Sequence, residues 1–135
     1  MDKKLEKIVQ ALQENFGTSY EEFRDEAHVF VKAENIVEAL TLLRDKFEFE
    51  LLSALTATDY YPQETPRFHV VYQLTSLARN LSVQLRVAVN SDQPKVPSAA
   101  FVYDTANWRE REVFDMFGIV FDGHPDPRRI LTPEG

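Results

Sequence analysis

The sequence predicts an α+β fold in which helices pack on one face of a four-stranded mixed sheet with an antiparallel hairpin. Three observations predict this fold. Apolar residues recur at helical spacing in two segments of the first half, strict alternation marks residues 81–90, and a third helical segment lies near the C-terminus. A chain of 135 residues, 44% of them hydrophobic, can bury one core. We expect one domain over residues 1–118 and an extended C-terminal arm over residues 119–135.

The first half of the chain contains two segments with helical spacing. In the first, apolar residues fall at i, i+3, i+4, i+7 and i+11, and they are Leu5, Ile8, Val9, Leu12 and Phe16. Gly17 follows where a helix C-cap is expected. A short alternating strand is predicted over residues 27–31. A second helix is predicted over residues 33–46 from the spacing of Ile36, Leu40, Leu43 and Phe47.

Three strands and a helix are predicted in the second half. Residues 49–60 form a long apolar and β-branched run, which is typical of a buried strand. Residues 68–74 and 81–90 alternate apolar and polar side chains across a short polar turn near residues 78–80, which predicts an antiparallel hairpin. A proline-bearing link then leads to a last helix, predicted over residues 98–117.

Composition excludes several classes of function. The net charge of −7 argues against nucleic-acid binding, which needs clustered Lys and Arg. The sequence has no cysteine, so this chain forms no disulfide and supplies no thiolate to an iron–sulfur cluster. The N-terminus reads as a charged helix and not as a signal peptide, and no apolar run approaches the roughly 20 residues that span a bilayer. We expect no direct membrane insertion, and any link to a membrane should run through another protein.

The stretch from Asn107 to Leu131 is the most distinctive part of the sequence. Its helical portion carries apolar side chains around much of its circumference, interleaved with charged ones. Pairs such as Arg111 with Asp115, and Arg109 with Glu112, have the spacing of neighbours on a helix surface. We expect one side of this helix to pack on its own sheet and the other on a partner. A frayed terminus is the alternative for the residues that follow the helix.

A catalytic pair of carboxylates is one alternative interpretation of this stretch. Glu110, Glu112 and Asp115 could act as acid and base if they were held close together in a poorly solvated site. Glu110 and Glu112, however, are two residues apart and point to different faces of a helix. Each also has an arginine within pairing distance, which favours structural ion pairing.

A metal site built from Asp122, His124 and Asp126 is a second alternative. The flanking glycine and proline give flexibility but no fixed three-ligand geometry. We interpret His124 as a hydrogen-bonded structural residue. No glycine-rich loop or serine elbow supports a nucleotide-binding or hydrolytic site.

The same stretch resembles the signature of the C-type subunit family of NADH-quinone oxidoreductase, called the 30-kilodalton subunit in mitochondria. That signature is an Ala-Asn-Trp run, a helix with the pattern Glu-Arg-Glu-x-x-Asp-x-x-Gly, and an arm reading Gly-His-Pro-Asp-x-Arg-Arg-Ile-Leu. The matching residues are Ala106 to Trp108, Glu110 to Glu112, Asp115, Gly118, Gly123 to Asp126, and Arg128 to Leu131. Pro127 stands where the family usually has leucine. The family normally continues beyond this arm, so we expect the sequence, which ends at Gly135, to be short relative to it.

The resemblance implies a non-catalytic subunit in the peripheral arm of proton-translocating NADH:quinone oxidoreductase (respiratory complex I). It implies a place on the cytoplasmic side of the membrane, beside neighbours of the D (49-kilodalton) and B types. In the family this subunit has no flavin, iron–sulfur cluster or quinone site, so we expect no cofactor here and expect those groups in the partner subunits. The alternatives are an equivalent subunit of a related membrane-bound hydrogenase or ferredoxin-dependent complex, and a small carboxylate/His hydrolase.

The residues expected at the interface with partner subunits come from this signature. Their expected role is ion pairing and packing, with no catalytic, cofactor-binding or metal-binding residue in the chain. They are Trp108, Arg109, Glu110, Arg111, Glu112, Asp115, His124, Asp126, Arg128 and Arg129.

Overall fold

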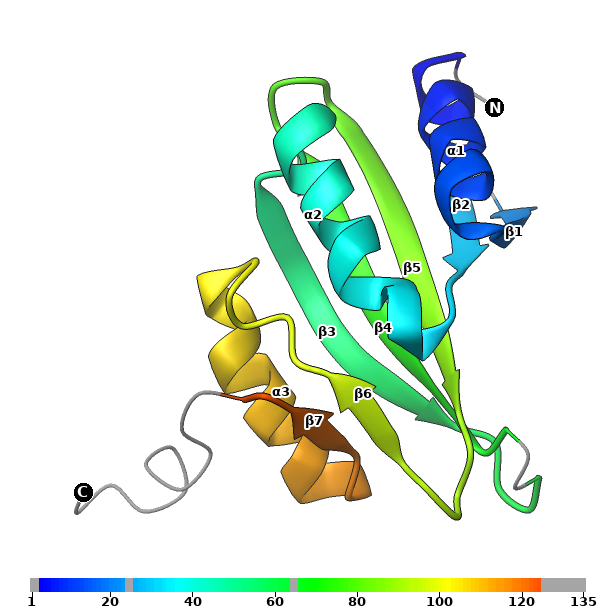
Figure 1. The fold of residues 1–135 in the computed structure, drawn as a ribbon, viewed down its shortest axis with the longest axis vertical. Coiled ribbons are helices and arrows are strands. Elements are labelled where there is room, and N and C mark those ends of the chain that lie inside the picture. Colours follow the sequence, from blue (N-terminus) through cyan, green and yellow to red (C-terminus); the bar gives the residue numbers. More distant parts are fainter. Residues whose placement is uncertain (1–2, 24–25, 64–65, 125–135) are drawn as a thin grey trace.

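The computed structural model describes residues 3–23, 26–63 and 66–124. The helices in this part of the chain are α1 (Lys3–Phe16), α2 (Ile36–Lys46) and α3 (Asp104–Phe117), with a short 3-10 helix, η1 (Ala33–Asn35), before α2. The strands are β1 (Ser19–Phe23), β2 (Glu26–Phe30), β3 (Leu51–Asp59), β4 (Phe68–Ser76), β5 (Leu81–Val89), β6 (Lys95–Pro97) and β7 (Val120–Asp122). The predicted α+β fold class is confirmed (Figure 1).

The predicted N-terminal helix is confirmed as α1. Its buried side chains are the apolar positions at helical spacing: Leu5, Ile8, Val9 and Leu12. Gly17 ends the helix, with φ +64 and its N–H donating to the carbonyl of Gln13 at 2.9 Å. The second predicted helix begins as η1 and continues as α2. Arg44 and Lys46 lie in the last turn of α2, where positive charge favours the helix dipole.

The main sheet has five strands, in the order β1-β2-β5-β4-β3, and not the four that the sequence predicted. The extra strand is β1, which pairs antiparallel with β2 in the register Glu21↔His28. Its sequence places two glutamates side by side and shows no alternation, so the apolar pattern did not reveal it. The sheet is mixed because β2 runs parallel to β5, with Ala27 opposite Val83.

The predicted hairpin is β4 paired antiparallel with β5, two neighbouring interior strands of the sheet. Alternate residues of both strands face the helices and are buried, among them Val70, Tyr72, Leu74, Val83 and Leu85. In Figure 1, α1 and α2 lie over one face of the sheet. Phe117 of α3 packs edge-on against Phe68 of β4, with ring centroids 6.1 Å apart, so α3 covers the same face.

The last predicted helix begins later than expected, at Asp104 instead of residue 98. Residues 98–103 form a turn in which the N–H of Tyr103 donates to the carbonyl of Ala99 at 3.0 Å. Before this turn lies β6, which pairs in parallel with β7 after α3, in the register Val96↔Phe121. The chain therefore returns after α3 to form a small second sheet beside the first (Figure 1).

No helix in the described ranges combines the length and the apolar character needed to cross a bilayer.

Candidate interaction site

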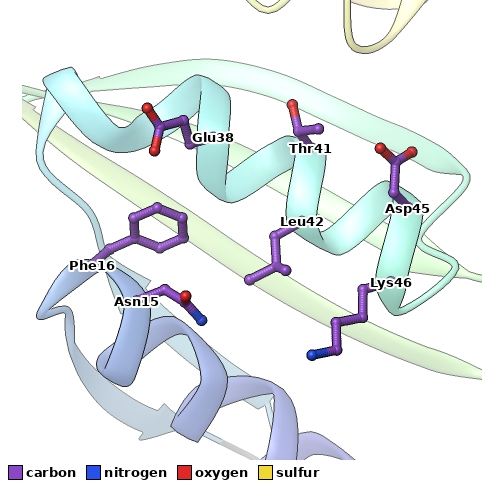
Figure 2. A pocket seen from close by; sticks show the side chains of 7 residues that line it. All are labelled: Asn15, Phe16, Glu38, Thr41, Leu42, Asp45 and Lys46. Carbon is purple, nitrogen blue, oxygen red and sulfur yellow. The ribbon is translucent and has the colours of Figure 1, made fainter.

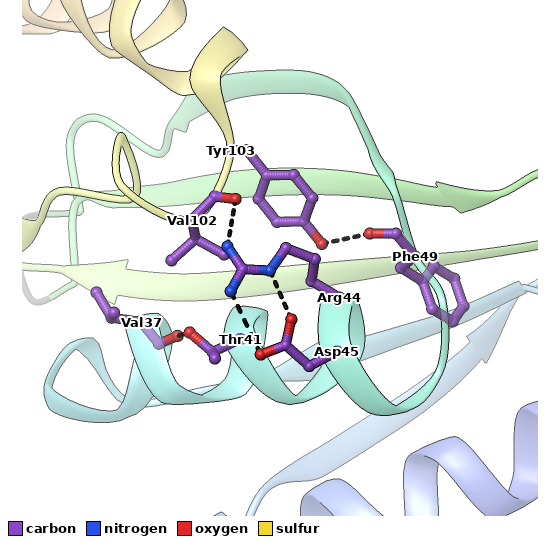
Figure 3. Close-up of polar contacts among 7 residues, drawn as sticks. All are labelled: Val37, Thr41, Arg44, Asp45, Phe49, Val102 and Tyr103. Carbon is purple, nitrogen blue, oxygen red and sulfur yellow. Dashed lines mark hydrogen bonds and ion pairs between the residues drawn. The ribbon is translucent and has the colours of Figure 1, made fainter.

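A set of polar contacts fixes the start of α3 to the end of α2 (Figure 3). Arg44 donates from Nη1 to the carbonyl of Val102 at 2.8 Å and from Nε to Asp45 at 2.8 Å. The Tyr103 hydroxyl donates to the carbonyl of Phe49 at 2.6 Å, and burial raises the pKa of this phenol, so it stays a donor. These contacts set the position from which α3 runs along β3.

Glu110 lies on the inner side of α3 and is 1% exposed. Its carboxylate accepts a hydrogen bond from the Ser98 hydroxyl and another from the Ala99 N–H, both at 2.6 Å. The Ser98 Oγ in turn accepts from the N–H of Ala100 at 3.1 Å. Glu110 therefore joins the helix to the turn that precedes it, and both carboxylate oxygens are engaged in this contact.

Burial dominates the electrostatics around Glu110. It raises the pKa of the Glu110 carboxyl, while the donors of Ser98 and Ala99, and the nearby His124, partly oppose the shift. Burial also raises the pKa of Tyr72 well above its usual value, and the negative charge of Glu110 adds to this effect. Tyr72 is fully buried, and its hydroxyl has no hydrogen-bond partner among the described residues. The inner side of α3 therefore forms a small polar cluster within the core.

Arg111 is the second buried charge on α3, at 6% exposure. Its Nη2 lies 3.2 Å from the Asp115 carboxylate, which confirms the predicted i, i+4 ion pair. Its guanidinium also lies 4.9 Å from the ring centroid of Phe114. Arg111 is thus held within its own chain.

The outer side of α3 carries exposed side chains of mixed character. Thr105, Trp108, Arg109 and Glu112 line one shallow depression, and Met116 lies one further turn along the same side. Trp108 is 59% exposed and Met116 is 76% exposed. We call these five residues the outer α3 surface. The second predicted ion pair, Arg109 with Glu112, is not formed in the described part of the chain.

The segment after α3 begins as part of the folded body and not as an arm. Gly118 caps the helix with φ +73, and its N–H donates to the carbonyl of Phe114 at 2.8 Å. Ile119 and Phe121 are then buried, at 0% and 6% exposure, as β7 pairs with β6. Strand pairing therefore continues to Asp122, within the stretch that the sequence assigned to a C-terminal arm. This happens because apolar residues on both sides of the glycine enter the same core.

His124 follows β7 and contacts the first turn of α3. Its Nε2 lies 2.9 Å from the carbonyl oxygen of Asn107, and since a carbonyl can only accept, Nε2 carries the hydrogen. His124 is half-buried, and its Nδ1 has no hydrogen-bond partner among the described residues. This contact fits the predicted structural role of His124.

The predicted interface residues do not form one surface. Trp108, Arg109 and Glu112 lie together on the outer side, whereas Glu110 and Arg111 are buried within the chain. Asp115 is exposed and paired with Arg111, and His124 is half-buried after β7, against the carbonyl of Asn107. The remaining three, Asp126, Arg128 and Arg129, lie outside the described residues.

The catalytic carboxylate pair and the metal site were the two alternative interpretations of this stretch. Glu110 and Glu112 lie on opposite sides of α3, one buried and one exposed, so they do not form a close pair of carboxylates. Within residues 3–23, 26–63 and 66–124, no group of three His, Asp or Glu side chains is arranged to hold a metal ion. The proposed metal set includes Asp126, which is not among these residues.

A wide hollow between α1 and α2 was not predicted from the sequence (Figure 2). Phe16 and Leu42 supply apolar side chains to it, and charged residues such as Glu38 and Lys46 stand around them. Its volume is about 500 Å³. Neither predicted helix showed a signal for it, because the hollow depends on how the two helices pack.

The fold places the chain in a class of small α+β domains for which a solved example exists. A trypsin-resistant fragment of Nqo5 superposes with a TM-score of 0.81 and 32% identity, covering 91% of this chain and 98% of that one. A chain of the membrane-bound sulfane sulfur reductase, an archaeal respiratory membrane complex, shares the fold with a TM-score of 0.77 and 23% identity. That match covers 91% of this chain and 72% of the other.

Sequence comparison then gives the family. Residues 29–135 match the model described as respiratory-chain NADH dehydrogenase, 30 Kd subunit, and the chain belongs to this family. The C-type subunit of NADH-quinone oxidoreductase from Salinispora tropica is 41% identical over 96% of this chain and 56% of its own length. The corresponding protein of Phenylobacterium zucineum is 50% identical over 76% of this chain and 48% of its own length. The chain therefore spans about half the length of these relatives.

Proposed function

We propose that this chain is a non-catalytic peripheral-arm subunit of proton-translocating NADH:quinone oxidoreductase. It would scaffold neighbouring redox subunits on the cytoplasmic side of the membrane, and electrons would pass through those neighbours from NADH to quinone. Family membership and the names of relatives that align with most of the chain support this proposal. The expected neighbours are subunits of the D (49-kilodalton) and B types, and we expect flavin and iron–sulfur clusters in partner subunits and not in this chain.

The outer α3 surface is the observation that carries the proposal. Trp108 and Met116 are large apolar side chains that stand well out of the chain, beside Arg109 and Glu112. Apolar side chains grouped with polar neighbours are typical of a surface covered by another protein, and Trp and Met are enriched at such surfaces. The buried inner side explains how α3 can present these residues rigidly.

The engagement of Glu110 supports a non-catalytic role. A general acid or base needs a carboxyl that can reach a substrate, and both Glu110 oxygens accept hydrogen bonds from the turn at Ser98 and Ala99. Glu112 is exposed on the opposite side of the helix and has no second carboxylate beside it in the described depression. A carboxylate hydrolase therefore has little support from the described residues.

Affinity purification from native membranes tests the proposal. A tagged chain should co-purify with the other subunits of NADH-quinone oxidoreductase. The double variant Trp108→Ser, Met116→Ser should lower their yield roughly tenfold or more, because central apolar anchors supply most of the affinity of an interface. Recovery of the tagged chain without any other subunit would contradict the proposed function.

A matched control separates this surface from general surface hydrophobicity. Leu77 in the β4–β5 turn is 69% exposed, close to the value for Trp108, and lies at the tip of the hairpin. Leu77→Ser should leave the yield of partner subunits unchanged. An equal loss in the control would show that the outer α3 surface is not the specific contact.

A further inference from the structure

The face of the five-stranded sheet turned away from the helices carries a continuous row of polar side chains. Gln73 of β4 donates to Glu26 of β2 at 3.3 Å, and Gln84 of β5 donates to Gln73 at 3.1 Å. Arg86 donates from Nε to Gln84 at 2.7 Å. None of the described helices covers this face (Figure 1). The row is therefore ordered by its own hydrogen bonds and ends at Arg86.

Arg86 lies in a hollow of about 350 Å³ at the end of this row. The hollow is lined by Glu21, Phe30, Tyr60, Gln63, His69 and Arg86. The Arg86 Nη1 lies 3.2 Å from the Tyr60 hydroxyl and 3.5 Å from Nδ1 of His69. The rings of Phe30 and Tyr60 both meet His69 edge-on, with centroids 6.0 and 4.8 Å away. A cation thus lies among aromatic side chains.

The environment of His69 favours its neutral form beside this cation. Burial lowers the pKa of His69, and the charge of Arg86 lowers it further. Because Nδ1 faces an arginine N–H, which can only donate, Nδ1 is the acceptor and the hydrogen resides on Nε2. The Nε2 hydrogen and the Nη2 hydrogens of Arg86 have no acceptor in the described residues. The hollow therefore offers donors of two kinds.

Arg86 has no carboxylate partner among the described residues, in contrast to the arginines that form ion pairs. Four of them lie within 3.2 Å of an acidic side chain: Arg44, Arg67, Arg79 and Arg111. Within the described residues, Arg86 hydrogen-bonds to the uncharged Gln84, Tyr60 and His69. Glu21 stands at the rim, exposed, and forms no ion pair with Arg86 in the described part of the chain. A half-buried guanidinium is stabilised best by a carboxylate with two acceptor oxygens.

We propose that this hollow binds the carboxylate of an aspartate or glutamate side chain from a neighbouring subunit. The inference rests on the proposed function for the existence of that neighbour, but it concerns the face of the sheet opposite to the one that α3 covers. The carboxylate would accept hydrogen bonds from Nη2 of Arg86 and Nε2 of His69. Phe30 and Tyr60 would shield the pair from water, which strengthens a charged hydrogen bond.

Variants of the tagged chain in native membranes test this proposal. Arg86→Gln keeps the bond to Gln84 possible but removes the charge, and it should lower the yield of co-purified subunits at least tenfold. Glu21→Gln is the matched control, since it removes a competing negative charge at the rim and should leave the yield unchanged or raise it. A loss in Glu21→Gln equal to that in Arg86→Gln would identify Glu21 as the counter-ion and overturn the proposal. An unchanged yield in Arg86→Gln would overturn it as well.

A cross-linking measurement keeps Arg86 intact and so does not depend on the folding of a charge variant. Gln63 is exposed at the rim, and Gln63→p-benzoylphenylalanine places a photoreactive group there. The expected product is a cross-link to a peptide of another subunit that contains Asp or Glu. A cross-linked peptide without an acidic residue, or no cross-link in a complex that assembles, would overturn the proposal. If the unsubstituted chain co-purifies with no other subunit, the proposed function is contradicted. If it co-purifies but the expected cross-link is missing, only the carboxylate-binding proposal is contradicted.

Discussion

The two sides of α3 are built from neighbouring residues, yet one side is buried in the chain and the other is exposed. On the inner side, Glu110 and Arg111 are almost fully buried, and their charges are satisfied within the chain. On the outer side, Trp108 and Met116 are largely exposed and have solvent around them. The comparison shows that one short charged signature can contain both the residues that position a helix and the residues that the helix presents.

The contrast also explains why the inner residues are charged at all. The turn at residues 98–100 leaves backbone N–H groups inside the protein, and an unsatisfied N–H in the core costs about 1–3 kcal/mol. Glu110 supplies two acceptor oxygens at the point where the Ser98 hydroxyl and the Ala99 N–H meet the helix. An apolar residue at this position would fill the space but leave the turn without acceptors.

The largest effect is expected for Glu110→Ala. The substitution removes both acceptors and opens a cavity, so the free energy of unfolding should fall by about 2–4 kcal/mol. Denaturant unfolding of the purified chain measures it. Glu112→Ala, two residues away on the outer side, should change the same quantity by no more than about 0.5 kcal/mol. Equal losses in the two variants would show that the inner and outer sides contribute equally to stability, which would contradict the prediction.

An intermediate effect concerns pH. Because the pKa of Glu110 in the folded chain lies above its usual 4.5, the folded state holds this proton more tightly than the unfolded state. The stability that the folded chain gains by binding this proton more tightly is fully present below pH 4.5. It is lost as the pH rises through the raised pKa of Glu110. The stability of the unsubstituted chain relative to Glu110→Gln should therefore decline as pH increases. A difference that stays constant or grows with pH would contradict a raised pKa.

Comparison with Glu110→Gln isolates this one group from others that titrate. Asp59, for example, has a lowered pKa because it accepts hydrogen bonds from Arg67, so its contribution is lost as pH falls. Asp59 is present in both proteins and cancels in the difference. What remains reports the environment of Glu110.

The smallest effect is expected for Asp115→Asn, at the boundary between the two sides. The Asp115 side chain is 46% exposed, so water screens its attraction to Arg111. The free energy of unfolding should fall by about 0.5–1 kcal/mol, and the loss should shrink at high salt. A salt-independent loss above about 2 kcal/mol would show that this ion pair is shielded from solvent, like the contacts of the buried inner side.

Local pattern was sufficient to predict most of the fold. Helical spacing predicted α1 and α2, and alternation predicted the β4–β5 hairpin, because each reflects a single buried face. β1 was missed because its two adjacent glutamates break the alternation. The start of α3 was misplaced because Ala99 and Ala100 suit a helix, whereas the structure uses them in a turn that contacts Glu110.

The site was less predictable than the fold. Sequence spacing identified the pair Arg111 and Asp115, since both partners lie on one helix. It could not identify the contact of Glu110 with Ser98, because no repeat relates residues 12 apart across a turn. Nor could it reveal the hollow at Arg86, where side chains from four separate strands and a loop meet only after the sheet forms.

The division into two sheets has a consequence for local opening of the domain. In the described residues, β6 and β7 pair only with each other, so the β6–α3–β7 unit is joined to the larger sheet by side-chain packing and by the contacts of Arg44 and Tyr103. This unit can detach without breaking any backbone hydrogen bond between the strands of the larger sheet. Its detachment therefore requires less free energy than global unfolding, and a partner pressed against α3 would suppress it.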